Sequence, residues 1–206
     1  MSSSHQIILT AWAAVYLLFL LWWGGRGKPL TAQETAQGIQ QLRSVVSGPL
    51  SLAHLHEVEQ FLAQDDGREF IMSNAVLYRK QALYPENSGF GPDPREADQR
   101  YGKAIIWPLI KRASVPIFIA RKTGQFVNDA NAPEWHYVAM VRYRSRRDFL
   151  NFAIDIEGQG ISVHKWAAIE QTQVFPVRPL VSGFSARFDM AVICALLAWG
   201  TTQLFA

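Results

Sequence analysis

The stretch "MVRYRSRRDFLNFAID", Met140 to Asp155, predicts a place where a strand passes into a helix. Successive side chains of an extended chain point to opposite faces, so Arg142 and Arg144 share one face of the strand. Ser145 then has the side chain of a helix N-cap, with Asp148 three residues further on. A joint of this kind belongs to a fold that mixes strands and helices, and the neighbouring segments decide which one.

Segments on both sides of this joint alternate between strand and helix patterns. "EFIMSNAVLYRK" has the period-two pattern of a strand, and Asp93-Pro94 is a strong helix start. In chain order we expect a strand over 69–80, a helix from Asp93, strands over 115–127 and 135–144, a helix over 146–156, a short helix over 161–170 and a strand over 172–177. The order β, α, β, β, α, β is that of the ferredoxin-like α+β fold, preceded here by two short helices. Its sheet carries helices on one face only, so we expect a second copy of the chain to cover the other face.

Both ends of the chain are apolar. Residues 7–23, "IILTAWAAVYLLFLLWW", and residues 190–206, "MAVICALLAWGTTQLFA", are each seventeen residues without a charge. With their flanks they approach the roughly 20 residues that a helix needs to span a bilayer. We therefore predict transmembrane helices over 7–25 and 188–206. The start "MSSSHQ" has no Lys or Arg, which favours a retained anchor over a cleaved signal peptide. The polar residues 201–203 weaken the second segment, for which a buried helix is the alternative.

The two anchors enclose a helical linker over 26–66 and an α+β domain over 67–180, which must lie on one side of the membrane. The basic residues nearest to the anchors lie at their inner ends, and they are Arg26, Lys28, Arg178 and Arg187. By the positive-inside rule we expect a two-pass protein of the bacterial inner membrane, with the central domain cytoplasmic and both termini outside.

Composition argues against a nucleic-acid partner. The 206 residues carry 20 basic and 17 acidic side chains, and a net charge of +3 lacks the basic excess of dedicated nucleic-acid binders. The four arginines between 142 and 147 do not form one stripe, because two lie on the strand and two open the helix. They fit a strand-to-helix joint with solvated charges, and a partner site or a contact with anionic lipid headgroups is the alternative. The single Cys194 allows neither an intramolecular disulfide nor a cysteine-based zinc site.

Four segments carry a resemblance to a known group of proteins. They are "FIMSNAVLYRK", "ADQRYGKAIIWPLIKR", "VPIFIARKTGQFV" and "VRYRSRRDFLNFAID…HKWAAIEQTQVFPV", within residues 68–178. The region resembles the dimeric α+β-barrel superfamily, and most of all an uncharacterised membrane-anchored family related to its antibiotic-biosynthesis-type monooxygenases. The resemblance implies a homodimer that packs sheet against sheet, and a ligand pocket between the sheet and the helices.

The catalytic candidates come from this resemblance. Haem-degrading members of the superfamily use an Asn on the first strand, a His after the second main helix as the iron ligand, and a nearby Trp. This implies catalytic roles for Asn74, His164 and Trp166, with His164 as the ligand of a haem cofactor. Trp107 is the alternative aromatic residue. Judged from the residues alone, His164 fits a helix position bonded to backbone or solvent, and Asn74 fits a bulged strand.

A binding site is predicted beside the long Gly- and Pro-rich loop over 80–94. Its candidate residues are Tyr78, Arg79 and Tyr101, together with Arg142 and Arg144 of the third strand. We predict no metal site, because His54 and His56 stand two residues apart on a helix and do not face one ion.

Two functions follow. The sequence lacks a phosphate loop, a nucleophile elbow and a zinc motif, which favours a membrane-anchored module that binds a ligand or a protein. The resemblance keeps a monooxygenase, with haem as a candidate cofactor, as the alternative. The expected partners are the lipid bilayer, a second copy of the chain, and a membrane protein packed on the small-residue face of Ala191, Ala195 and Ala198; no nucleic acid is expected.

Overall fold

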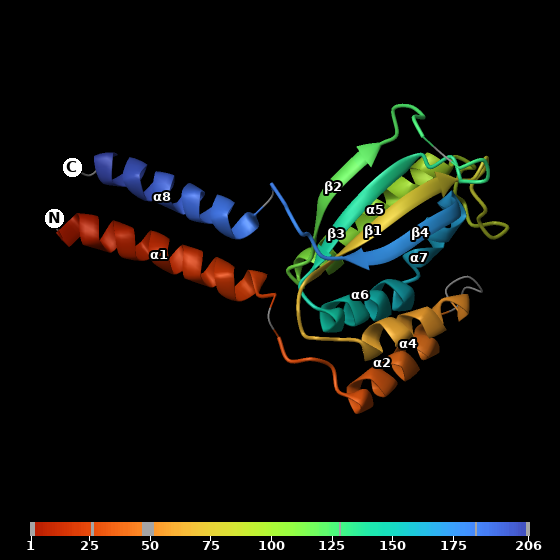
Figure 1. Cartoon of the computed structure of the whole chain (residues 1–206), viewed down its shortest axis with the longest axis horizontal. Helices are drawn as coiled ribbons and strands as arrows, with labels where there is room; N and C mark the ends of the chain where they lie inside the picture. Colours follow the sequence, from red (N-terminus) through yellow and green to blue (C-terminus); the bar gives the residue numbers. More distant parts are fainter. Residues whose placement is uncertain (1–2, 26, 47–51, 128, 184, 205–206) are drawn as a thin grey trace. The chain divides into compact units, whose positions relative to one another are not determined.

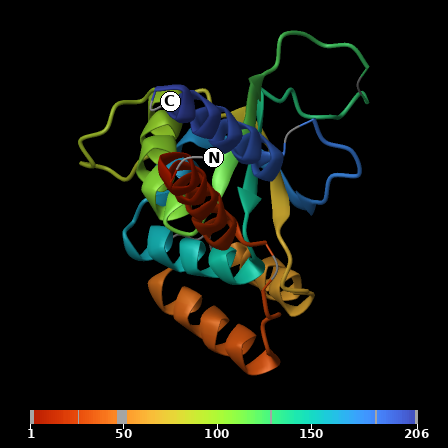
Figure 2. The ribbon, with the colours of Figure 1, turned by 90° about the vertical axis from the view of Figure 1, so that its left-hand side faces the viewer.

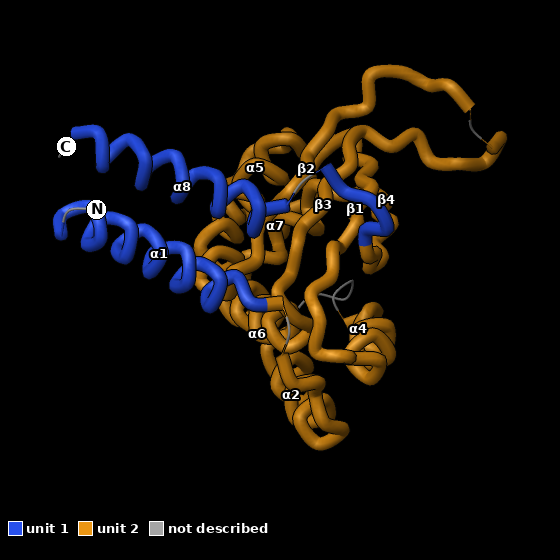
Figure 3. The backbone as a smooth tube through the Cα atoms, turned by 60° about the vertical axis from the view of Figure 1, so that its left-hand side comes forward, with its two compact units in different colours: residues 1–24, 179–206 blue, residues 25–178 orange. Residues whose placement is uncertain are grey.

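The computed structural model describes residues 3–25, 27–46, 52–127, 129–183 and 185–204. The chain forms two compact units, which are coloured separately in Figure 3. One joins the two ends of the chain, residues 1–24 and 179–206, and the other comprises residues 25–178. The second unit contains the α+β domain.

The α+β domain is built on a four-stranded antiparallel sheet with the strand order β2-β3-β1-β4. Its strands are β1 (Phe70–Tyr78), β2 (Val115–Arg121), β3 (Tyr137–Tyr143) and β4 (Ile169–Val177). The helices α5 (Pro94–Ile110), α6 (Arg146–Gly158) and α7 (Ser162–Ala168) pack against one face of the sheet (Figure 1). The predicted α+β class and the ferredoxin-like four-stranded sheet are confirmed.

Both predicted helix starts of this domain are present. The Asp93 side chain accepts a hydrogen bond from the backbone N–H of Arg95 at 2.8 Å, and Pro94 occupies the first helical position of α5. The Ser145 hydroxyl accepts from the backbone N–H of Asp148 at 3.1 Å and caps α6. These caps satisfy backbone donors that a helix leaves unpaired in its first turn.

The last strand begins earlier than the sequence pattern indicates. Ile169 and Glu170, which we expected at the end of the short helix, are the first two residues of β4. Ile169 is buried, pairs with Tyr78 of β1 and has an extended backbone with φ −98° and ψ 124°. Pairing with β1 therefore outweighs the helical continuation, and α7 ends at Ala168.

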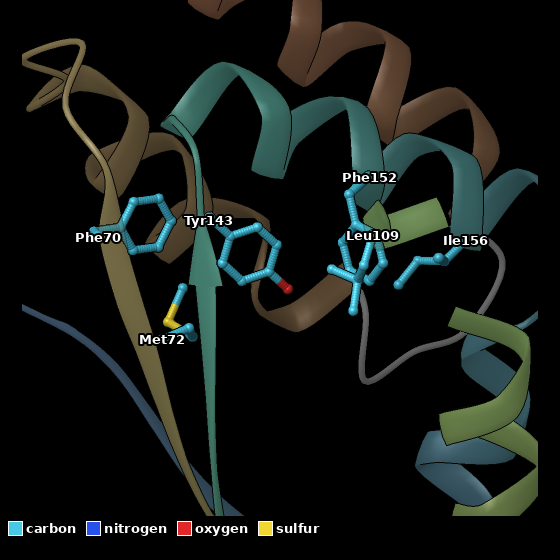
Figure 4. Close-up of a cluster of buried hydrophobic side chains, with 6 residues drawn as sticks. All are labelled: Phe70, Met72, Leu109, Tyr143, Phe152 and Ile156. Atoms are coloured by element: carbon cyan, nitrogen blue, oxygen red, sulfur yellow. The ribbon is translucent and has the colours of Figure 1, made fainter. Parts of the chain in front are cut away.

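An apolar core fills one end of the space between the sheet and the helices. Its buried members are Phe70, Met72, Leu109, Tyr143, Phe152 and Ile156 (Figure 4). Phe70 of β1 and Tyr143 of β3 lie opposite each other, and their rings stack at a centroid distance of 5.4 Å. The ring of Tyr143 reaches inward, with its hydroxyl on the side of Leu109 (Figure 4).

Two helices extend this core. The helices α2 (Ala32–Val45) and α4 (Leu55–Ala63) pack with α6 around Ile39, Leu42, Leu62 and Leu150. A Cβ atom added at Gly38 would overlap Cδ2 of Leu150, so α2 approaches α6 closely. Residues that we expected to act as a linker thus lie in the same compact unit as the sheet.

The other unit is an antiparallel pair of helices, α1 (Ser3–Trp23) and α8 (Ala186–Leu204). Trp12 Nε1 donates to Thr201 Oγ1 at 3.3 Å, and the Tyr16 hydroxyl donates to the backbone oxygen of Arg187 at 3.2 Å. Arg187 also donates to the backbone oxygen of Gly24 at 2.7 Å. The two chain ends therefore lie at the same end of this pair (Figure 1 and Figure 2).

Small side chains of α8 face α1. Cys194, Ala198 and Thr202 are buried, each four residues after the one before, as expected for one face of a helix. Of the predicted small-residue face, Ala198 is buried in this pair and Ala195 is exposed, and a membrane-protein partner on that face stays a prediction.

Among the described helices, α1 is the one that is long and apolar enough to cross a membrane, a property that N-terminal signal sequences share. The helix α8 has the same kind of apolar centre, but Arg187 and Asp189 lie in its first turn. A second membrane-spanning helix is therefore not supported by length and composition. Arg26, one of the basic residues used to orient the anchors, lies outside the described residues.

Candidate ligand site between the sheet and the helices

A carboxylate and two tyrosines tie α5 to the sheet. Asp98 of α5 accepts hydrogen bonds from the hydroxyls of Tyr78 on β1, at 2.7 Å, and Tyr137 on β3, at 3.1 Å. Burial raises the pKa of both tyrosines, and the Asp98 carboxylate raises it further. Both hydroxyls therefore keep their protons and act as hydrogen-bond donors at physiological pH.

Lys165 of α7 lies beside this group. Its ammonium nitrogen is 4.9 Å from the centroid of the Trp166 ring and 6.0 Å from that of Tyr101. Burial lowers the pKa of Lys165, while the charges of Glu157 and Asp98 act in the opposite direction. Within the described part of the chain, this ammonium has no hydrogen-bond acceptor and no ion-pair partner.

Two further tyrosines belong to the same layer, and of these Tyr143 is buried and Tyr101 is partly exposed. Burial raises the pKa of Tyr101, on α5, and of Tyr143, on β3. Neither hydroxyl makes a hydrogen bond to another described residue. These hydroxyls and Lys165 are not buried donors left without a partner, a state that among the described side-chain atoms is found at Nη1 of Arg100.

His164 lies under the loop that follows β1. Its Nδ1 atom is hydrogen-bonded to the hydroxyl of Tyr84 at 2.9 Å, and its ring lies edge-on to that of Phe90 at 4.9 Å. Burial lowers the pKa of His164, and the charge of Arg100 lowers it further. The imidazole is therefore neutral at physiological pH.

The catalytic candidates are held by different parts of the protein. The side-chain nitrogen of Asn74 donates to the backbone oxygens of Met72, at 3.0 Å, and Ala139, at 3.3 Å. The Trp166 ring stacks on His54 at a centroid distance of 5.8 Å. No hydrogen bond joins Asn74 to His164 among the described residues. Their catalytic roles, and haem binding by His164, stay predictions.

The predicted binding residues fall into two groups. Tyr78 and Tyr101 belong to the polar residues between α5, α7 and the sheet, which we call the interior group and which include Asp98, Tyr137 and Lys165. Arg79 lies beside them and donates through Nε to the backbone oxygen of Trp166 at 3.4 Å. Arg142 and Arg144 lie elsewhere, at the end of β3 that leads into α6. Of the five predicted binding residues, the three around the loop therefore lie together, and the two arginines of β3 do not.

The arginines of the joint have partners inside the protein. Arg142 is buried and donates to Glu69, through Nε at 2.9 Å, and to the backbone oxygen of Ala113. Arg144 contacts both carboxylate oxygens of Asp148, at 2.8 and 2.7 Å. Such bidentate pairs hold a guanidinium in a fixed position. A role for these two arginines in binding a partner stays a prediction.

The remaining two arginines connect α6 to the helices before the sheet. Arg146 donates to the backbone oxygen of Phe61 at 2.6 Å and lies over its ring at 4.4 Å. Arg147 pairs with the Glu34 carboxylate at 2.7 and 3.1 Å. The predicted strand-to-helix joint is present, but its charges are not simply solvated, because Arg142 is buried and the other three arginines are bonded within the protein.

No group of His, Cys, Asp and Glu side chains within the described ranges is placed to hold a metal ion. A shallow groove of about 220 Å³ lies between α2 and α6, lined in part by Glu34, Gln41, Arg147 and Asn151. It contains none of the predicted site residues.

Sequence analysis did not select three residues of the interior group as candidate site residues. They are Asp98, Tyr137 and Lys165. Asp98 and Tyr101 are three residues apart on α5 and so share a helix face, a signal that was present. Tyr137 lies opposite Val76 on the helix-facing side of the sheet, which depends on strand register. The position of Lys165 depends on how α7 packs, and no local pattern indicates it.

Comparisons with known proteins support the fold. No family model matches the chain, and no curated protein matches it. Two crystal structures of RPA0582, a protein of unknown function from Rhodopseudomonas palustris, are similar to it. The first, of the methylated protein, has 21% identity and a TM-score of 0.54, over 68% of this chain and 97% of the other. The second has 20% identity and the same TM-score, over 67% of this chain and 98% of the other.

A dabb family protein with a ferredoxin-like fold from Mesorhizobium loti is more distant. It has 9% identity and a TM-score of 0.35, over 57% of this chain and 100% of the other. Similarity at this level bears on neither ligand nor activity.

Proposed function

We propose that the chain is a membrane-anchored binding module that takes up a small ligand between its sheet and its helices. The observation that supports this proposal is the polar group between α5, α7 and the sheet, in which Asp98 accepts from Tyr78 and Tyr137 beside the partly exposed Lys165. An accessible ammonium next to hydrogen-bonding side chains can bind an acceptor that a ligand supplies.

The pair of helices α1 and α8 serves as the anchor in this proposal. Contacts between them run from Trp12 and Thr201 to Gly24 and Arg187, so α8 is paired with the apolar α1 along its length. With both helices in the bacterial inner membrane, Lys28 and Arg178 favour a cytoplasmic domain and termini outside. Tags at both termini should then be open to protease outside intact cells, and a tag in the 80–94 loop should be protected. The reverse pattern contradicts this orientation.

The second part of the proposal is a homodimer through the sheet face that the helices leave uncovered. Phe118 and Phe175 on this face are 50% and 44% exposed, and Ile71, Leu77 and Met140 lie on the same face by strand register. Such an apolar sheet face gains free energy when a second copy covers it.

Native mass spectrometry of the full chain, released from a mild detergent, tests both parts. We expect the mass of a dimer with a small molecule that is released on unfolding. Phe118→Asp should give a monomer, because Phe118 faces the uncovered side. Ile119→Asp is the matched control: Ile119 is also exposed, but it points to the helix side and should leave the dimer intact. A wild-type monomer contradicts the dimer, and a ligand-free dimer contradicts ligand binding.

A haem-dependent monooxygenase remains the second candidate, because the neutral imidazole of His164 is the form that ligates iron. Titration of the full chain with haem, beside His164→Ala and the exposed control His56→Ala, decides between the two. A stoichiometric Soret shift that only His164→Ala removes would favour the oxygenase. Under the binding proposal we expect no such shift.

A further inference from the structure

Building on the proposed function, of which the membrane anchor is a part, we infer that the last turns of α5 dock on the lipid surface of the membrane that holds α1. Trp107 and its apolar neighbours then lie at the level of the lipid headgroups. The inference follows from the exposed face of α5, the position of that face in the domain and the charge that borders it.

The exposed face of α5 changes from polar to apolar along the helix. The exposed residues of its first half are polar, and they are Arg95, Glu96, Gln99 and Lys103. The exposed residues of its last turns are apolar: Ile106, Trp107 and Ile110 are 42%, 70% and 37% exposed. Single apolar residues on a surface need no explanation, whereas a cluster of them marks a place where another surface binds.

The short connection to α1 limits how far one end of the domain can be from the membrane. The helix α1 ends at Trp23, and Gly25, two residues later, already belongs to the same compact unit as the sheet. Two residues span at most about 8 Å. With α1 in the bilayer, the part of the domain that binds Gly25 is therefore held close to the lipid surface.

A chain of contacts connects Gly25 to the last turn of α5. The backbone oxygen of Gly25 accepts from the N–H of Glu69 at 3.2 Å, and the Glu69 carboxylate accepts from Nε of Arg142 at 2.9 Å. Arg142 also donates to the backbone oxygen of Ala113 at 2.6 Å. The N–H of Ala113 in turn donates to the backbone oxygen of Ile110, the last residue of α5, at 2.9 Å. The apolar face thus lies at the end of the domain where the chain enters it.

The chain also leaves the domain at this end. Val177, the last residue of β4, pairs with Ile71 near the start of β1, and β2 begins at the same end of the sheet (Figure 1). Leu180 and Val181 follow β4 and are 99% and 94% exposed. Apolar side chains that are exposed next to an anchor are suited to contact with lipid.

Basic side chains border the apolar face. Lys103 is exposed, and Lys111 and Arg112, which follow α5, share the single carboxylate of Asp155. Two cations on one anion leave a positive charge, which attracts anionic headgroups, and Trp is enriched at the headgroup level of membranes. A second copy of the same face would bring like charges together, so a bilayer surface fits this face better.

The first test measures contact with lipid at single cysteines in the full chain with Cys194→Ala. A bimane label is attached to Ile110→Cys or to Phe126→Cys, in vesicles of phosphatidylcholine and phosphatidylglycerol that contain lipids with a spin-labelled headgroup. Phe126 is the matched apolar control, because it is 99% exposed and follows β2 at the other end of the sheet. We expect the spin label to quench the fluorescence at 110 at least about twice as strongly as at 126.

Equal quenching at the two positions overturns the inference. So does a label at 110 that is shielded from iodide but not quenched by lipid, because protein would then cover this face. A label on Leu17→Cys of α1, with spin labels in the acyl chains, separates the inference from the proposed function. Quenching at 17 without quenching at 110 overturns the α5 contact alone, whereas no quenching at 17 overturns the anchor and the inference with it.

A second variant tests the part played by the Trp107 side chain. Trp107→Ser should reduce the quenching at 110 by about half or more, because it removes the largest apolar side chain of the face. Leu83→Ser, which replaces a residue that is 68% exposed in the 80–94 loop, is the matched control and should leave this quenching unchanged. Unchanged quenching in Trp107→Ser would overturn docking through this face.

Discussion

The two ends of the layer between the sheet and the helices contain different kinds of side chains. At one end, aromatic rings lie with centroids 5.1 to 6.2 Å apart, and these rings are Phe61, Phe70, Tyr143, Phe149 and Phe152. At the other end, Asp98 binds two tyrosine hydroxyls, and Lys165 lies nearby without an anionic partner in the described chain. The apolar end gains free energy from burial, whereas the polar end must offset desolvation. The first end is suited to holding the fold, and under the proposed function the second end is where a ligand would bind.

The largest effect is expected at the apolar end. Phe70 is 4% exposed and contacts Phe61, Tyr143 and Phe149, so Phe70→Ala removes the ring that these three share. We expect a loss of about 3–5 kcal/mol in the free energy of unfolding, measured by denaturant titration of the full chain. A loss below 1 kcal/mol would mean that this end does not hold the fold, and the comparison would fail.

A smaller effect is expected at the polar end. Asp98→Ala leaves the hydroxyls of Tyr78 and Tyr137 without an acceptor, which we expect to cost about 2–3 kcal/mol. Asp98→Asn, which keeps one acceptor oxygen, should cost less. Adding Tyr78→Phe and Tyr137→Phe to Asp98→Ala should recover stability, because the unpaired hydroxyls are then gone. If the triple variant is less stable than Asp98→Ala, the cost comes from packing instead.

Two helical glycines sharpen the comparison further. Gly38→Ala forces a methyl group into Leu150, and the overlap should exceed the roughly 1 kcal/mol that Ala gains over Gly in a helix. We expect a net loss of about 1 kcal/mol. Gly102→Ala on α5, where an added Cβ meets no atom within 4 Å, should raise stability by about 0.5–1 kcal/mol. Thermal unfolding of both variants measures the difference, and effects of equal sign would contradict close packing of α2 on α6.

The smallest effect concerns pH. Hydrogen bonds from Arg147 and Thr31 lower the pKa of Glu34 from 4.5 to about 2. The folded state therefore keeps the carboxylate charged where the unfolded chain takes up a proton. The stabilisation is complete above the unfolded pKa and is lost as the pH falls from 4.5 towards 2. We expect the Tm difference between wild type and Glu34→Gln to shrink over this range, and a constant difference would contradict the ion pair.

Features set by neighbouring residues were predictable from the sequence. The caps at Asp93 and Ser145 depend on a side chain and a backbone N–H two or three residues away, and both are present. The capping box of Thr31 and Glu34 is another example. The alternating pattern of β1 likewise predicted a strand, and in the structure Phe70 and Tyr78 lie on its helix-facing side.

Features that join distant segments were not predictable in the same way. Asp98 and Tyr137 are 39 residues apart in the chain, and their hydrogen bond depends on both sheet register and helix placement. The contact of Gly38 with Leu150 depends on how α2 packs on α6, which no local pattern specifies. The start of β4 was placed late because Ile169 pairs with Tyr78, a residue far away in the sequence.

The attachment points of the α+β domain have a mechanical consequence. The incoming chain binds through Gly25 and Gly27 to residues 67–69, and the outgoing chain binds through Arg178 to Asp66. Gly67 has a left-handed backbone, φ 70°, and no room for a Cβ beside Gly27. Tension applied between these two ends loads the end of the β1–β4 ladder, where Ile71 pairs with Val177. Under force the two strands would separate pair by pair, as in a zipper, while the remaining sheet carries little of the load.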